Sequence, residues 1–295
     1  MGGGSDDEEA QGLSDEPARD LPPAPSGGHA QPPRDWTPPR PAPQPPELGD
    51  PPMPDLRPLG EEAPPPRPRK PFWRRALFQL LKTILAFLAV SIGMTVIYRF
   101  VPPPITWTMI GDLLGGHGVA KRWMPLSRID PDMARAAIAA EDSRFCTHHG
   151  FDFTAIEQAY ARNQKGGRIR GGSTISQQTA KNVFLWQGGG YFRKGLEAYF
   201  TLLIENIWGK RRIMEVYLNV AEWAPGVYGA EAASQFHFRK PAAKLTKREA
   251  ALLAAVLPNP IKRRAGKPSK RVSSIANRIM SRMNGMGSYL ACLGP

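Results

Sequence analysis

Residues 131–152 of this 295-residue sequence read PDMARAAIAAEDSRFCTHHGFD. The alanine-rich segment 134–143 contains no helix breaker, so we expect it to form a helix. This helix runs directly into Glu141 and Asp142, which are followed by an aromatic residue, histidines and a glycine. A carboxylate at the end of an apolar helix can be partly desolvated, and desolvation raises a carboxyl pKa towards the range used in general acid–base catalysis. By itself, the pattern also suits a structural Glu-Asp pair at a helix end.

The next polar segment, residues 168–182, reads RIRGGSTISQQTAKN. Thr174 and Gln177 have the spacing of a capping box, which predicts a helix that continues to about Leu185. The two glycines and the hydroxyl residues precede a helix N-terminus, where free N–H groups and the helix dipole favour an anion. Polar side chains four residues apart then cover one flank of the helix. The segment suits a pyrophosphate and sugar hydroxyls, and an ordinary capped surface helix is the alternative.

Two further segments place polar side chains at helical spacing. Arg193 and Glu197 lie four residues apart, and an exposed ion pair of this kind contributes only ~0.3–0.5 kcal/mol. Glu215 and Asn219 have the same spacing, and there a structural role is favoured. Several other acids are expected to be solvated or in surface ion pairs. These are Asp112, Glu157, Glu205, Glu222 and Glu231.

From residue 131 onward, the sequence predicts successive helices. Thr246 and Glu249 form a second capping box, and Pro258 ends the helix that follows. Strand-like alternation is scarce, so we predict a mainly α-helical fold without internal repeats. The remaining expected helices span residues 154–163, 192–208, 211–221 and 269–283.

Residues 1–70 differ in composition from the rest of the chain. They hold 20 of the 32 prolines, with 13 acidic and 7 basic residues. Such a segment cannot bury enough apolar surface to offset its ordering entropy, so we expect it to be disordered. The remaining residues carry 32 Lys and Arg against 13 Asp and Glu. This charge predicts an anionic partner, which can be nucleic acid, anionic lipid or a phosphorylated substrate.

The apolar run at residues 76–98, ALFQLLKTILAFLAVSIGMTVIY, is long enough to cross a bilayer core of ~30 Å as a helix. Five basic residues between Arg67 and Arg75 precede it, which predicts a cytoplasmic N-terminal side and an exported C-terminal part. Its distance from the N-terminus argues against a cleaved signal peptide. The exported orientation in turn argues against nucleic acid as the partner.

The chain contains two cysteines, Cys146 and Cys292, and no CxxC motif. Two thiolates are too few for a zinc site of the cysteine-rich kind. A disulfide between them and a pair of reduced thiols are both consistent with the sequence.

Together, these segments resemble the peptidoglycan glycosyltransferase family, which includes the N-terminal domains of class A penicillin-binding proteins and the monofunctional biosynthetic transglycosylases. The family's Glu-Asp-x-x-Phe-x-x-His-x-Gly-x-Asp pattern is met at residues 141–152, and its Gly-x-Ser-Thr-Ile-x-Gln-Gln-x-x-Lys-Asn pattern at residues 171–182. Its Arg-Lys-x-x-Glu pattern is met at residues 193–197, and its Glu-x-Tyr-Leu-Asn pattern at residues 215–219. The resemblance spans about residues 105–265 and leaves the N-terminal 70 residues unmatched.

The resemblance implies a lysozyme-like α-helical fold with a small membrane-proximal part around residues 163–199. Residues 183–186 and 191–192 would dip into the membrane interface there. The implied reaction transfers the growing glycan from undecaprenyl pyrophosphate to the 4-hydroxyl of the next lipid-linked disaccharide-peptide, lipid II. Glu141 would be the general base, and Glu197 would orient nearby cations or hold a divalent metal. The implied substrate-binding residues are Asp142, Phe145, His148, Gly150, Arg170, Ser173, Thr174, Gln177, Gln178, Lys181, Asn182, Arg193, Lys194 and Asn219.

The resemblance also implies the monofunctional form, because the chain has no Ser-x-x-Lys and no Lys-Thr-Gly motif of a transpeptidase site. No cofactor is expected to be required, and Mg²⁺ or Mn²⁺ at the pyrophosphate is the open alternative. The expected organisation is a cytoplasmic tail (1–70), a basic flank with a transmembrane helix (71–100), a connector (101–130), the catalytic domain (131–265) and a C-terminal helix and tail (266–295).

The expected partners are lipid II, the growing glycan strand and lipids of the bacterial cytoplasmic (inner) membrane. The basic cluster at residues 262–271 either contacts anionic headgroups or is solvated. The proline-rich tail is hypothesised to recruit divisome or elongasome proteins, and unchanged localisation and partner pull-down after its deletion would remove that idea.

Two other functions compete with polymerisation. A peptidoglycan hydrolase of lysozyme-like fold could use two carboxylates, but a neutral glycan does not require the cations described above. A non-catalytic scaffold for cell-wall enzymes would not require Glu141 or Lys181, and both are present.

Overall fold

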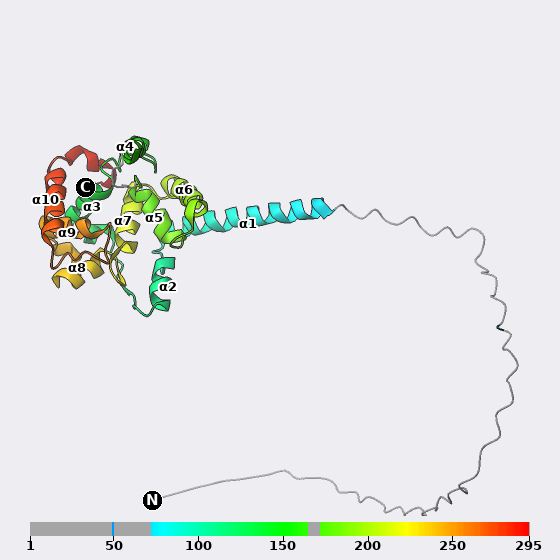
Figure 1. Ribbon diagram of the computed structural model, residues 1–295, viewed down its shortest axis with the longest axis horizontal. Coiled ribbons are helices and arrows are strands. Elements are labelled where there is room, and N and C mark those ends of the chain that lie inside the picture. The colour runs from blue at the N-terminus through cyan, green and yellow to red at the C-terminus, as the bar shows by residue number, and fades with distance from the viewer. Residues whose placement is uncertain (1–48, 50–71, 165–171, 295) are drawn as a thin grey trace, which may run out of the picture. The chain divides into compact units, whose positions relative to one another are not determined.

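The computed structural model describes residues 49, 72–164 and 172–294. Residues 68–295 form one compact unit, whose described part is mainly helical, as predicted (Figure 1). The tail predicted to be disordered, residues 1–70, lies outside the described residues except for Gly49. The candidate ligand Arg170 also lies outside them.

The described residues contain ten α-helices, three short strands and three 3-10 segments. The helices are α1 (Phe72–Phe100), α2 (Trp107–Leu114), α3 (Pro131–Glu141), α4 (Phe153–Gln164), α5 (Ile175–Phe184), α6 (Gly190–Ile207), α7 (Lys210–Val220), α8 (Ala230–Phe238), α9 (Lys247–Val256) and α10 (Lys270–Asn284). The strands are β1 (Ala120–Lys121), β2 (Glu222–Ala224) and β3 (Val227–Tyr228). The 3-10 segments are η1 (Leu126–Arg128), η2 (Ala242–Lys244) and η3 (Gly287–Leu293).

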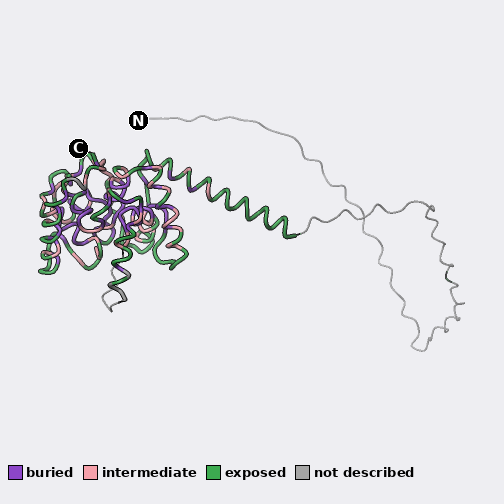
Figure 2. The backbone as a smooth tube through the Cα atoms, turned by 90° about the horizontal axis from the view of Figure 1, so that it is seen from above, coloured by how far each residue is buried: buried purple, intermediate pink, exposed green. Residues whose placement is uncertain are grey.

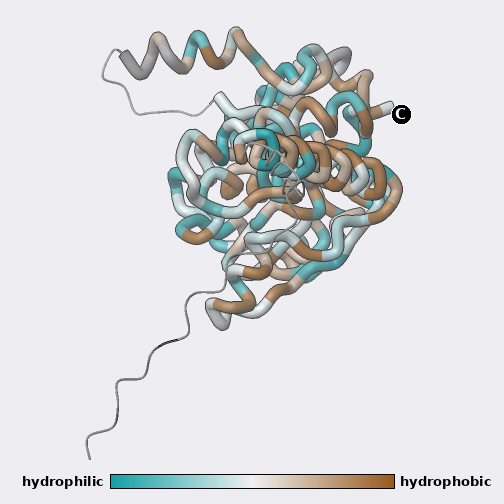
Figure 3. Tube along the Cα trace, turned by 90° about the vertical axis from the view of Figure 1, so that its right-hand side faces the viewer, coloured by the Kyte–Doolittle hydropathy of each residue, from teal (hydrophilic) through white to brown (hydrophobic). Residues whose placement is uncertain are grey.

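Small side chains bring α3 and α9 close together in the core. Ala136 and Ala137 of α3 and Ala250 and Ala254 of α9 are completely buried, and α10 packs against both helices. Figure 2 shows the buried segments gathered in the interior of the domain, with exposed segments around them. Hydrophobic and hydrophilic stretches alternate along the helices, as expected of elements with one buried face (Figure 3). Because α3 is embedded in this core, its C-terminal residue Glu141 is held on a rigid support.

Both predicted capping boxes are confirmed, at the starts of α5 and α9. The strands, by contrast, were not predicted. They form a sheet in the order β1-β3-β2, in which β3 pairs parallel to β1 and antiparallel to β2. Gly226, just before β3, has φ +70, and a Cβ atom there would lie 2.6 Å from the Gly118 carbonyl oxygen. Glycine is therefore required where the connector approaches β3.

Among the described residues, α1 is the one helix long and apolar enough to cross a membrane. It contains the predicted span, and its 29 residues correspond to a length of about 43 Å. Its C-terminal end packs against α6. The Trp208 indole donates a hydrogen bond of 2.7 Å to the Thr95 carbonyl, and the Ser91 and Tyr199 hydroxyls lie 2.7 Å apart. The globular part is thus fixed directly to the end of α1.

The segment between α5 and α6 only partly agrees with the predicted membrane-interface role. Tyr191 and Phe192 are 98% and 73% exposed, which suits insertion into an interface. Residues 183–185 are buried, and the Phe184 ring stacks on the Phe200 ring at a centroid distance of 4.4 Å. The prediction that residues 183–186 enter the interface is therefore wrong for the first three of them.

Candidate active site

Glu141, the last residue of α3, is the half-buried carboxylate at the centre of the site. The Gln178 side-chain amide on α5 donates a hydrogen bond of 2.9 Å to Glu141 Oε2. Burial raises the Glu141 pKa above its ordinary value of 4.5, the Gln178 hydrogen bond lowers it and the Asp142 charge raises it. Positive charge on Arg263 and Lys181 also lowers it, and the net direction is upward. A carboxylate of this kind is a better proton acceptor than an exposed one.

Replacing Gln178 by alanine is expected to move the acidic limb of the pH–activity profile to higher pH. The lost hydrogen bond stabilises the ionised carboxylate, so its removal raises the Glu141 pKa further. The measurement is kcat/KM for polymerisation as a function of pH. Gln235→Ala is the matched control, because Gln235 donates to Glu231 on α8 instead. An unchanged acidic limb in Gln178→Ala would show that Glu141 does not control it.

The loop after Glu141 is braced by a buried network. His148 Nε2 lies 2.9 and 3.0 Å from the two Asp142 carboxylate oxygens. The Gly150 amide donates to His148 Nδ1 at 3.1 Å, which assigns the imidazole proton to Nε2. Asp142 also accepts the Ile175 amide at 2.9 Å, and the Thr174 hydroxyl donates to the Gly150 carbonyl at 2.6 Å. These contacts set the position of α3 relative to the start of α5.

Two small cavities are lined by the two members of the Glu141–Gln178 pair. One, of about 120 Å³, is lined by Glu141, Ser173 and Thr174 among others. The other, of about 160 Å³, is lined by Gln178, Lys181 and Asn182 among others. Half-buried residues of the polar flank that the sequence predicts on α5 therefore line the space beside the catalytic candidate.

Cationic groups from α5 and from the first turn of α6 gather around Glu197. Glu197 is 3% exposed, and its carboxylate accepts Arg193 Nη1 at 2.7 Å and the Lys194 ammonium group on its other oxygen. The Lys194 ammonium also lies 3.3 Å from the Ser173 hydroxyl. Burial lowers the Lys181 pKa, and the Glu197 charge opposes this shift. The set holds more positive than negative charge and suits a polyanion.

Glu197 was predicted either to orient cations or to hold a divalent metal. Both of its oxygens are already bonded to a cationic side chain. Within the described residues, no group of three His, Cys, Asp or Glu side chains is arranged to hold a metal ion. These contacts are those of the orienting role. A divalent metal shared between Glu197 and the pyrophosphate stays a prediction, and no step below passes through a metal.

Several residues predicted to bind substrate are placed in the scaffold of the site. Phe145 is fully buried, and Gln177 closes the capping box with Thr174. Asn219 is 1% exposed, and its amide bonds the Met124 amide and carbonyl at 2.7 and 2.8 Å. Asn219 therefore holds the connector against α7 and has no free group for a ligand.

A second polar cluster was missed from the sequence. The Tyr228 hydroxyl donates to Asp112 Oδ2 at 2.7 Å, and burial followed by the Asp112 charge raises the Glu222 pKa. Glu222 and Tyr228 line the same cavity as Lys181. No local signal identifies this cluster, because its members come from α2 and the sheet.

The prediction that the remaining acids are solvated or in surface pairs is wrong for several of them. Asp112 and Glu222 belong to the cluster above. Glu205 accepts Lys210 Nζ at 2.7 Å with its side chain 6% exposed, and Glu231 is 2% exposed and accepts the Ala242 amide. Glu157 is exposed as predicted.

Residues 108–284 match the protein family described as Transglycosylase. The chain belongs to this family. It is 53% identical over 209 residues to the biosynthetic peptidoglycan transglycosylase of Caulobacter vibrioides. The aligned residues cover 70% of this chain and 91% of that relative. It is 48% identical to the protein of the same name from Pasteurella multocida, and the alignment covers 75% of this chain and 93% of that relative. It is also 48% identical to the one from Pseudomonas aeruginosa, over 72% of this chain and 95% of that relative.

The transglycosylase match begins in α2 and ends with α10. It therefore contains every candidate site residue, and the family predicted from the motifs is confirmed. Helix α1 and Cys292 lie outside the matched residues. They are features of this chain that the family match does not explain.

Proposed function

We propose that this protein polymerises lipid II into β-1,4-linked glycan strands and releases undecaprenyl pyrophosphate, without transpeptidation. The observation that carries the proposal is the pairing of a desolvated base, Glu141, with the cationic groups of Lys181, Arg193 and Lys194 around α5 and α6. Relatives that share about half of the matched residues are named biosynthetic peptidoglycan transglycosylases, which supports the same activity here.

In the proposed reaction, the Glu141 carboxylate takes the proton of the acceptor 4-hydroxyl. The acceptor oxygen attacks the anomeric carbon of the donor, and the bond from that carbon to the pyrophosphate oxygen breaks. The bonding electrons leave with the pyrophosphate, and attack from the face opposite the leaving group inverts the configuration. Lys181, Arg193 and Lys194 stabilise the developing negative charge. Glu197 is a positioning residue, because it holds Arg193 and Lys194 in place.

A hydrolase would use the same carboxylate on a preformed strand, whose glycan backbone is neutral. Such a substrate has no anionic leaving group, so it does not account for the cations beside α5. A scaffold does not account for a half-buried carboxylate with a raised pKa.

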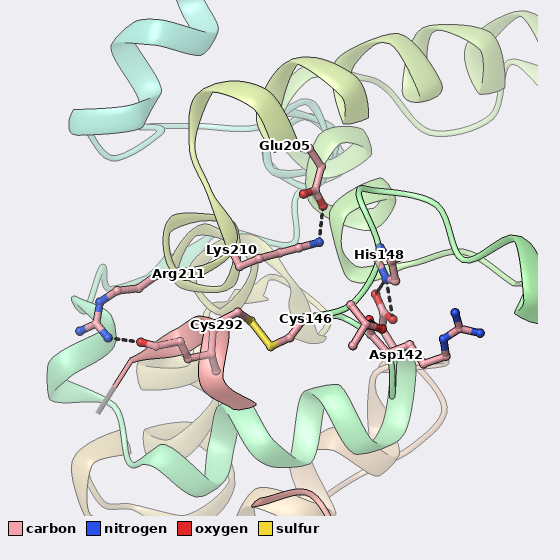
Figure 4. Close-up of a disulfide and its surroundings, with 10 residues drawn as sticks. Asp142, Cys146, His148, Glu205, Lys210, Arg211 and Cys292 are labelled. Atoms are coloured by element: carbon pink, nitrogen blue, oxygen red, sulfur yellow. Dashed lines mark hydrogen bonds and ion pairs between the residues drawn. A yellow bond between two sulfur atoms is a disulfide. The ribbon is translucent and has the colours of Figure 1, made fainter. Parts of the chain in front are cut away.

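We further propose that α1 spans the bacterial cytoplasmic membrane, with the N-terminal tail inside and the catalytic domain outside. The five basic residues at and just before the start of α1 support this orientation. Cys146 and Cys292 form a disulfide (Figure 4), which resolves the alternative that the sequence left open. Disulfides persist in oxidising compartments outside the cytoplasm, so the bond also supports an exported domain.

The test uses the detergent-solubilised full chain and fluorescent lipid II, with products separated on a gel. We expect a ladder of polymers that a muramidase degrades. Absence of polymer together with cleavage of preformed strands would favour the hydrolase. Binding of lipid II without either activity would favour the scaffold.

A further inference from the structure

A basic pocket of about 510 Å³ lies between the end of α9 and the start of α10. Five positively charged side chains contribute to its wall. They are Lys262, Arg263, Arg264, Lys267 and Arg271. The wall also includes Ser269, the N-cap of α10, whose side chain accepts the Val272 amide. The positive end of a 15-residue helix thus adds to the charge of the side chains.

The charge of this pocket is not neutralised by carboxylates in the described part of the chain. Within residues 72–164 and 172–294, none of the five basic groups lies within 4.0 Å of a carboxylate oxygen. Lys262, Arg264 and Lys267 are exposed. Like charges that converge without a counter-ion repel each other, and an anionic ligand would remove that repulsion.

The pocket adjoins the candidate active site through Arg263. This half-buried side chain donates to the Ala255 carbonyl of α9 at 2.8 Å, which fixes it between pocket and core. It is also close enough to Glu141 for its charge to lower the Glu141 pKa. Asn259 of the pocket wall is also adjacent in sequence to Pro260, which lines the cavity of Gln178 and Lys181. A ligand in the pocket would therefore lie beside the candidate active site.

The position of the pocket argues against membrane headgroups as its occupant. Figure 1 shows α9 and α10 on the side of the domain away from α1, and α1 packs on α6 instead. If α1 crosses the membrane, the pocket faces the extracytoplasmic space. The pyrophosphate of the substrate is also an unsuitable occupant, because its lipid tail keeps it at the membrane.

We propose that this pocket binds the carboxylates of the peptide carried by the incoming lipid-linked disaccharide. The inference rests on the proposed function, which places that sugar beside Glu141. The peptide is the remaining anionic part of such a substrate and can extend away from the membrane. A pocket of this volume holds a short segment of peptide and not just a single ion. Arginine and lysine form charge-assisted hydrogen bonds with carboxylates.

The test compares the triple substitution Lys262→Gln, Arg264→Gln and Lys267→Gln with wild type on two precursors. One is lipid II with free peptide carboxylates, and the other is the same molecule with those carboxylates amidated. For the free precursor, we expect the variant to raise KM about tenfold, which corresponds to ~1.4 kcal/mol. For the amidated precursor, we expect wild type and variant to have the same KM. Arg263 stays unchanged because it influences Glu141.

The matched control removes the same charge elsewhere on the surface, by Lys244→Gln, Arg248→Gln and Arg278→Gln, all at exposed positions. We expect this control to leave both KM values unchanged. Equal effects of the pocket variant on both precursors would overturn the inference. The assay is repeated in vesicles with and without anionic lipid. A KM effect that depends on the anionic lipid and not on amidation would assign the pocket to lipid headgroups and would also overturn the inference.

A binding experiment separates this inference from the proposed function. Calorimetry with a water-soluble disaccharide-peptide, without lipid or pyrophosphate, requires no turnover. We expect both amidation of the ligand and the pocket substitutions to weaken binding about tenfold, or ~1.4 kcal/mol. Equal binding of free and amidated ligand to wild type, or no binding of the free ligand, would overturn the inference whether or not the protein polymerises lipid II.

Discussion

Replacement of Glu141 by glutamine is expected to slow glycan polymerisation by about 10²–10⁴-fold, the contribution typical of a general base. Glutamine has almost the same shape as glutamate and can still bond to Gln178, but it cannot accept the proton of the acceptor hydroxyl. The loss should appear in kcat, because the cations proposed to bind the pyrophosphate are unchanged. The measurement is the initial rate of lipid II consumption, together with the gel pattern of products.

The same substitution should not lower the thermal stability of the protein at neutral pH. A carboxylate whose folded-state pKa is raised destabilises the fold at pH values above that pKa, because its ionised form is partly desolvated. A neutral amide removes this cost. An unchanged or slightly higher melting temperature would therefore show that the lost activity does not result from unfolding.

Glu157→Gln is the control for Glu141→Gln, since Glu157 is an exposed carboxylate of α4. It should retain wild-type activity. If Glu141→Gln itself retains most of the wild-type rate, Glu141 is not the base. The mechanism would then have to use another carboxylate near the two cavities, and Glu222 beside Lys181 would be the first to examine.

The sequence predicts those parts of the fold that depend on neighbouring residues. The capping box at Thr174 and Gln177 uses a spacing of three residues, and the structure contains it. The sheet could not be predicted, because strands of two or three residues are too short to show alternation. The contact between Asp112 and Tyr228 joins residues 116 positions apart, and a single sequence contains no signal for it.

Within the candidate site, the motifs identify the residues of the site. They are a less reliable guide to the role of each residue. Lys181 and Gln178 face the cavity beside Glu141, as the polar flank of α5 suggests. Asn219 belongs to an equally prominent motif, yet its amide is occupied by the backbone of Met124. A buried amide and a ligand-binding amide look alike in sequence, because burial depends on where the connector packs.

Replacing both Cys146 and Cys292 by serine is expected to destabilise the protein by about 3–5 kcal/mol, since the disulfide closes a long loop. The two residues are 146 positions apart. The bond fastens η3 to the loop that also carries Asp142 and His148 (Figure 4). For a domain of this size, the melting temperature should fall by on the order of 10 °C. The melting temperature is measured with and without a reducing agent. The reducing agent should lower the melting temperature of the wild type and leave that of the double variant unchanged.

Activity should respond to this loss less than stability does. The hydrogen bonds from Asp142 to His148 and Ile175 brace the catalytic loop without the disulfide, so at 25 °C the double variant should polymerise lipid II within a few-fold of wild type. Its activity should disappear at a lower temperature. Alkylation of the protein extracted from membranes provides the independent check. Two reactive thiols in the folded wild type would show that the bond does not form in the cell, and the support that the disulfide gives to an exported domain would be lost.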